Sequence, residues 1–92
     1  MPPPTLLVAD DHPLFRAALI QVLHERFAPL QTLEAASAAT LGQALQDHPE
    51  VELVLLDLAM PGARGFSALL HVRGEYPQVP VVVISSNDHP RV

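Results

Sequence analysis

Short apolar runs alternate along the chain with longer stretches in which apolar residues recur at helical spacing. The short runs are bounded by turn or polar residues and predict strands at residues 5–9, 30–36, 51–57 and 79–84. The intervening stretches predict helices at about residues 14–27, 37–48 and 64–75. This alternation, with short connections, predicts a parallel sheet covered by helices on both faces, with right-handed crossovers.

The strength of these signals differs between segments. Residues 5–9 and 51–57 are nearly continuous apolar runs, which are typical of strands buried on both faces. The run at 30–36 is weaker, and Ser37 after it is a suitable N-cap for the second helix. The first helix is predicted to be amphipathic from five apolar positions, which are Phe15, Ala18, Leu19, Val22 and Leu23.

Composition limits the classes of protein that fit. A chain of 92 residues is one domain, and 49% hydrophobic residues are ample for a core. Charged residues make up only 16%, below the usual fraction of about a quarter, which indicates deep burial or an apolar surface meant for a partner. There is no cysteine, which excludes disulfides and thiol catalysis.

Charge and hydropathy limit the partners and the cellular location that we expect for the chain. The net charge is −5, lysine is absent and the five arginines are scattered, so we expect no direct nucleic-acid binding by this segment. The first residues have neither the basic nor the apolar region of a signal peptide. No apolar run approaches the roughly 20 residues that span a membrane. The cytoplasm is therefore the expected location.

Polar residues directly follow or end three of the four predicted strands. Asp10 and Asp11 follow the first, Asp57 ends the third, and Ser85 and Ser86 follow the fourth. Parallel α/β sheets bind ligands beyond the carboxyl ends of their strands, so the three acids meet if the first and third strands are neighbours. Three close carboxylates raise a pKa or hold a cation, and an all-oxygen set suits Mg²⁺. An aspartate in such a site can also be the nucleophile that accepts a phosphoryl group.

A simpler interpretation exists for each acid taken alone. An aspartate after a strand is commonly a turn former, which would explain Asp57. Asp10 and Asp11 could interact with the N-terminal dipole of the first helix. The joint pattern, with two apolar strands ending in acids and another ending in hydroxyls, favours a shared site.

Three segments resemble the receiver domain of two-component response regulators: LLVADDHPLFR at 6–16, VLLDLAMPG at 54–62 and VVVISS at 81–86. The Asp-Asp-His-Pro-Leu-Phe-Arg opening is most similar to the LuxR/NarL-type subgroup, in which a helix-turn-helix follows the receiver. The resemblance covers essentially the whole chain after the prolines at 2–4. It implies an α/β fold of the flavodoxin-like (CheY-like) type, a three-layer sandwich with a parallel sheet in the order 2-1-3-4(-5).

The resemblance also implies a role for particular residues. Asp57 would be the phosphoacceptor, and Mg²⁺ would be bound by Asp10, Asp11, Asp57 and the backbone carbonyl of Ala59. Ser85 would be the switch hydroxyl that turns toward the phosphoryl oxygens. The loops beside the acceptor would be shaped by Pro61, Gly62 and Ser86.

The function implied is phosphorelay signal transduction. Asp57 would take a phosphoryl group from a sensor histidine kinase, and an output domain outside this chain would regulate transcription. Such a domain is a regulatory phosphoacceptor that catalyses only its own phosphotransfer and dephosphorylation, and is not otherwise an enzyme.

The chain departs from the family pattern at its C-terminal end. It supplies four strands and three helices, where the family has five of each, and it has no lysine to pair with the phosphoryl group. We therefore expect residues 5–92 to be a receiver domain that is incomplete at its C-terminus, preceded by a proline leader at 1–4. Truncation would leave apolar faces open, which predicts self-association.

Two rival functions stay open. A phosphatase or phosphotransferase with an aspartyl nucleophile would usually carry a second acid two residues later, where this chain has Ala59. A non-phosphorylated pseudo-receiver that serves as an interaction module is the other alternative, because fold does not fix function. His12 and His89 lie near the predicted site, but we interpret them as solvated or capping residues because neither has metal-ligand spacing.

Overall fold

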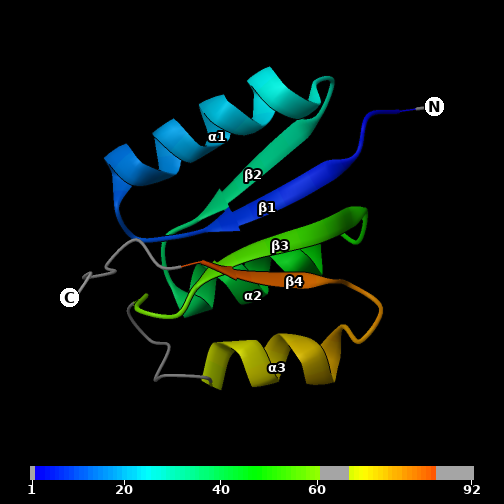
Figure 1. The fold of residues 1–92 in the computed structure, drawn as a ribbon. Helices are drawn as coiled ribbons and strands as arrows, with labels where there is room; N and C mark the ends of the chain where they lie inside the picture. The colour runs from blue at the N-terminus through cyan, green and yellow to red at the C-terminus, as the bar shows by residue number, and fades with distance from the viewer. Residues whose placement is uncertain (1, 61–66, 85–92) are drawn as a thin grey trace.

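The computed structural model describes residues 2–60 and 67–84 (Figure 1). In chain order its elements are β1 (Thr5–Ala9), α1 (Pro13–Phe27), β2 (Gln31–Ala35), α2 (Ala38–Asp47), β3 (Val51–Asp57), α3 (Ser67–Glu75) and β4 (Val81–Ile84). Every predicted strand and helix is present with similar bounds. The predicted start of the third helix, near residue 64, lies outside the described residues. None of the described helices has the length and apolar character needed to cross a membrane.

The strands form one parallel sheet in the order β2-β1-β3-β4. This is the predicted order 2-1-3-4, in which the strand order reverses between β1 and β3. Figure 1 shows α1 on one side of the sheet and α2 and α3 on the other. The chain therefore has the three layers of the predicted flavodoxin-like fold.

The main core lies between the sheet and the α2–α3 layer. Alternate residues of the central strands point into it, because successive side chains of a strand face opposite sides. From β1 and β3 these include Leu7, Val54 and Leu56, which are fully buried. The helices contribute Leu41, Leu45, Ala68 and Val72, and Met60 fills the space after β3.

The start of α2 is fixed by the predicted cap. The Ser37 hydroxyl accepts a hydrogen bond from the Thr40 backbone N–H at 3.2 Å, and the Ser37 N–H donates to Thr40 Oγ1 at 3.0 Å. This reciprocal pair is a capping box, which satisfies two of the backbone donors that a helix N-terminus leaves unpaired. The cap fixes where the chain leaves β2 and enters α2.

The α1 side of the sheet is packed differently. The strand residues Leu6, Val8 and Leu55 are buried, but no residue of α1, which the structure describes in full, is buried. The predicted amphipathic stripe is only partly correct, because Leu19 and Leu23 are half-buried while Phe15 and Val22 are exposed. A helix about 10 Å wide covers roughly two strands spaced about 4.8 Å apart. Apolar residues on the flanks of α1 therefore stay partly or largely exposed.

Candidate functional site

The pairing of β1 with β3 brings two aspartates to one edge of the sheet. Ala9 pairs with Leu56, so Asp10 and Asp57, the next residues in each chain segment, lie side by side beyond that pair. Both are fully buried. Buried carboxylates are costly unless hydrogen bonds or opposite charges compensate them, so their presence together points to a functional site.

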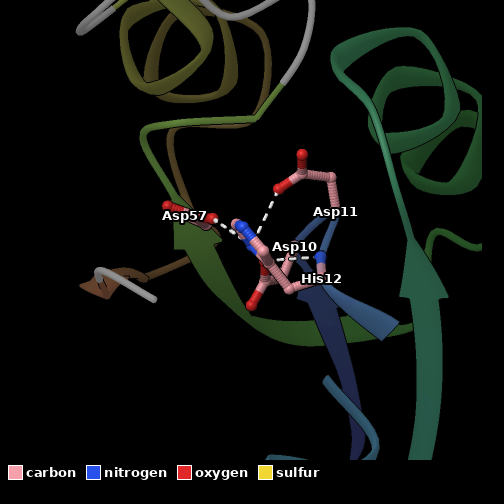
Figure 2. Close-up of side chains that lie close together, drawn as sticks. All are labelled: Asp10, Asp11, His12 and Asp57. Carbon is pink, nitrogen blue, oxygen red and sulfur yellow. Dashed lines mark hydrogen bonds and ion pairs between the residues drawn. The ribbon is translucent and has the colours of Figure 1, made fainter. Parts of the chain in front are cut away.

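Four side chains meet at this edge: Asp10, Asp11, His12 and Asp57 (Figure 2). One ligand atom from each lies within 4.8 Å of all the others. The structure thus brings together the three acids whose proximity the sequence predicts. It also places the His12 imidazole among these acids, a contact that the sequence did not predict.

The acid pair after β1 is held by backbone hydrogen bonds. The Asp10 N–H donates to the carbonyl of Ala35 at 2.9 Å, which continues the pairing of β1 with β2 by one residue. Asp10 Oδ1 accepts the backbone N–H of His12 at 3.0 Å, a local turn that short acidic side chains commonly make. Pro13 then occupies the first helical position of α1. These contacts direct the chain from strand to helix and keep both acids at the sheet edge.

The Asp57 carboxylate is oriented by the turn after β3. Its Oδ1 accepts the backbone N–H of Ala59 at 3.0 Å. Its Oδ2 lies 3.9 Å from His12 Nδ1 and faces the rest of the cluster. Ala59 therefore lies beside Asp57, and the metal-binding role of its carbonyl oxygen stays a prediction.

His12 was the least expected member of the cluster. Its Nδ1 lies 3.0 Å from Asp10 Oδ1 and 3.0 Å from Asp11 Oδ1. Although His12 occupies the N-cap position of α1, its side chain makes no capping hydrogen bond there. Of the two predicted roles, capping is wrong for the His12 side chain, whereas its 49% exposure agrees with a solvated residue.

The acids around the ring change its ionisation. The hydrogen bond to Asp10 raises the pKa of His12 above its usual 6.5, and the negative charges of Asp11, Asp10 and Asp57 act in the same direction. Partial loss of water contact opposes them. The raised pKa favours the protonated ring, whose positive charge offsets part of the cluster's negative charge.

Arg16 supports the site from α1 and was missed by sequence reasoning. Its Nη1 donates to the backbone carbonyl of Asp10 at 2.5 Å, and its Nε donates to Glu34 Oε1 at 2.6 Å. The guanidinium therefore links the end of β1, the first turn of α1 and strand β2. The sequence could have indicated this role, because Arg16 lies one helical turn after His12. Side chains of a helix tilt toward its N-terminus, so the Arg16 side chain reaches the loop before α1.

Several predicted site residues cannot be compared with the geometry. Ser85, Ser86, Pro61, Gly62 and His89 lie outside the described residues. Their roles stay predictions from the family resemblance.

The Response regulator receiver domain family matches residues 6–92. The chain belongs to the response regulator receiver family. Receiver domains are regulatory units of two-component systems, so the predicted family is confirmed. The sheet order and three layers described above are those of this family's fold.

Relatives of this receiver are regulators from several bacteria. It is 38% identical over 87 residues to the glycerol metabolism activator of Pseudomonas putida, covering 95% of this chain and 39% of that protein. It is 34% identical over 88 residues to the nitrate/nitrite response regulator protein NarL of Escherichia coli, covering 95% and 40%. This receiver chain thus spans about two fifths of the length of these curated relatives.

Solved structures support the same fold. A response regulator receiver protein from Pseudomonas putida superposes with a TM-score of 0.82 at 26% identity, covering 97% of this chain and 73% of that one. The RcsB response regulator of Salmonella typhimurium gives a TM-score of 0.82 at 22% identity, covering 98% and 46%. At 22% identity, the likeness to RcsB concerns the receiver fold alone.

Proposed function

We propose that this receiver accepts a phosphoryl group on Asp57 from the phosphohistidine of a sensor histidine kinase, with a divalent cation bound beside it. The observation that carries the proposal is the cluster at the end of β1 and β3, where one carboxylate oxygen each of Asp10, Asp11 and Asp57 lies within 4.8 Å of the others. A phosphoacceptor needs an available carboxylate and a means of offsetting phosphoryl charge, and this cluster offers both.

The donor atoms fit Mg²⁺. Carboxylates of Asp10, Asp11 and Asp57, together with the carbonyl oxygen of Ala59, would supply oxygen ligands of the type that Mg²⁺ takes along with water and phosphate oxygens. When bound, the ion offsets the negative charge that the transferred phosphoryl group spreads over its oxygens. Because the three carboxylates lie close together and repel one another, a cation bound among them is stabilised electrostatically.

The protein's own part in the transfer is positioning. The Ala59 N–H holds Asp57 Oδ1, which leaves Oδ2 facing the cluster as the attacking atom. Oδ2 forms a bond to phosphorus while the phosphorus–nitrogen bond of the donor breaks and its electron pair stays on the leaving imidazole. The product is an aspartyl phosphate, and the burial of Asp57 limits the access of water to it.

Transmission of the signal is proposed from the family resemblance. Ser85 would turn its hydroxyl toward the phosphoryl oxygens, and Pro61, Gly62 and Ser86 would shape the loops beside the acceptor. An output domain outside this chain would then regulate transcription in the cytoplasm. A coupling of about 1–3 kcal/mol between phosphorylation and the output state is typical of such switches.

We also propose self-association through apolar surface on the α1 side of the sheet. Leu14 and Phe27 of α1 are 87% and 64% exposed, and Val82 on the edge strand β4 is also exposed. Light scattering of the 92-residue chain at micromolar concentration should give a mass above one chain. A mass of one chain across the concentration range would contradict this part of the proposal.

The pseudo-receiver interaction module remains the second candidate, because the receiver fold alone does not establish phosphorylation. Incubation with Mg²⁺ and beryllofluoride, a phosphoryl analogue, separates the two. Amide NMR shifts at β1 and β3 that disappear in Asp57→Asn support phosphoacceptance. Unchanged spectra in a chain that binds Mg²⁺ alone would support an interaction module. Asp47→Asn, at an exposed acid of α2, is the matched control.

A further inference from the structure

The position of His12 distinguishes this cluster from one built of oxygen atoms alone. Its Nδ1 is 3.0 Å from one oxygen of Asp10, 3.0 Å from one oxygen of Asp11 and 3.9 Å from Asp57 Oδ2. Figure 2 shows the imidazole among the three carboxylates and not turned away from them. A nitrogen donor is therefore part of the atoms that lie within 4.8 Å of one another.

These separations match the spacing of donor atoms around one small divalent ion. With bonds of about 2.1 Å, neighbouring donors of an octahedral ion lie about 3.0 Å apart and opposite donors about 4.2 Å apart. The distances from His12 Nδ1 to the three acids lie within these limits.

Asp11 provides a second, independent observation. Its Oδ1 atom is buried and 3.0 Å from the ring nitrogen, yet among the described residues no group donates a hydrogen bond to it. The hydrogen bond of the ring nitrogen goes to Asp10 Oδ1, so it does not satisfy the Asp11 oxygen. A cation between the ring and the carboxylates would satisfy it.

We propose that His12 Nδ1 is a metal ligand, which makes this a mixed nitrogen–oxygen site that favours transition ions, which accept imidazole nitrogen, over Mg²⁺. The inference rests on the proposed cation site of Asp10, Asp11 and Asp57, and deepens it by naming the class of ion. Imidazole suits transition ions, whereas Mg²⁺ favours oxygen donors. The ligating ring is neutral and carries its proton on Nε2.

Mn²⁺ is the probe that tests this inference, because its unpaired electrons report the nuclei bound to it. Electron spin-echo envelope modulation of Mn²⁺ in the 92-residue chain should show an imidazole nitrogen, and His12→Ala should lose it. Titration should show Mn²⁺ affinity about tenfold lower in His12→Ala than in the wild type. Mg²⁺ affinity should change less than about threefold. His71→Ala, an exposed histidine of α3, is the matched control and should keep the nitrogen signal.

The nitrogen signal decides the inference separately from the proposed function. Mn²⁺ bound without imidazole modulation, or with modulation that survives in His12→Ala, would overturn the role of His12 and leave the acidic site intact. Absence of binding by either ion would contradict the proposed cation site itself.

Discussion

At the residue scale, the site depends on a balance between three acids and the few groups that compensate them. Asp10 and Asp57 are fully buried, and a buried carboxylate is stable only where hydrogen bonds or positive charge offset its desolvation. Backbone N–H groups of His12 and Ala59 supply two such bonds, and the His12 ring supplies part of the charge. Substitution of one of these acids therefore changes the ionisation of the His12 ring.

The first residue-scale prediction concerns the His12 ring in the metal-free protein. Its NMR titration midpoint should lie above 6.5, and Asp10→Asn should lower it, because the Asp10 hydrogen bond is the largest cause of the raised pKa. Asp11 and Asp57 also face the ring and should retain part of the effect in that variant.

The sign of the linked stability follows from the direction of the shift. A group whose pKa is higher in the folded state contributes stability below its unfolded pKa, and that contribution is lost as pH rises through the folded pKa. Unfolding of the metal-free chain should therefore show a His12-dependent loss of stability from about neutral pH upward. A pH profile identical in His12→Ala would contradict this.

The second residue-scale prediction concerns Asp57 and added Mg²⁺. At 100 times its dissociation constant, a ligand that binds only the folded state raises the free energy of unfolding by about 2.7 kcal/mol. If Asp57→Asn weakens binding about tenfold, the same Mg²⁺ concentration gives only about 1.4 kcal/mol. Thermal unfolding with and without Mg²⁺ measures the difference, and an equal shift in both proteins would rule out Asp57 as a ligand. Asp47→Asn should respond to Mg²⁺ as the wild type does.

Sequence reasoning could locate the acids but not the imidazole. Strand ends in a parallel sheet converge by topology, so Asp10, Asp11 and Asp57 could be placed together without coordinates. The direction of the His12 ring depends on a local turn, in which its own backbone N–H bonds to Asp10 Oδ1. That turn is a matter of side-chain and backbone geometry, which residue spacing alone does not encode.

At the element scale, the predicted strands and helices follow from strong local signals. Continuous apolar runs gave β1 and β3 their bounds, and the Ser37 cap gave α2 its start. The prediction was weaker for the packing of α1. Helical spacing of apolar residues indicates which face of the helix is apolar, but not which residues pack against that face. How deeply a helix is buried depends on its neighbours, and those are a property of the whole domain.

An element-scale prediction concerns Gly42, in the interior of α2. A Cβ added at this position would meet no atom within 4 Å. Glycine in a helix interior is destabilising by roughly 0.5–1 kcal/mol relative to alanine, so Gly42→Ala should raise the free energy of unfolding by that amount. Urea denaturation measures it. Leu41→Ala, at the neighbouring buried position, should instead lower the free energy of unfolding by about 2–5 kcal/mol. If Gly42→Ala does not raise the free energy of unfolding by more than the experimental error, the packing described here is contradicted.

At the scale of the whole molecule, the two sides of the sheet are unequal. The α2–α3 side carries the continuous buried cluster, whereas most of the exposed large apolar residues, including Leu14, Val22 and Phe27, lie on the α1 side. Exposed apolar surface can mark a site of association. This asymmetry agrees with the low charged fraction of the sequence.

The whole-molecule prediction separates association from folding. Substituting Leu14→Gln and Phe27→Gln together should shift the chain toward a single-chain mass in sedimentation velocity. The free energy of unfolding of the isolated chain should change by less than about 0.5 kcal/mol for each exposed site. Leu7→Ala, at a fully buried position, is the contrasting control and should cost about 2–5 kcal/mol. Association that persists in the double variant would show that another surface is responsible.

The pairing of β1 with β3 has a further consequence for how the chain folds. Asp10 and Asp57 become neighbours only after the intervening crossover has closed and the two strands are in register. Interactions completed late in folding act mainly on the unfolding rate and leave the folding rate almost unchanged. A bound cation should therefore lengthen the lifetime of the native state, and the folding limb of a chevron plot should hardly respond to it.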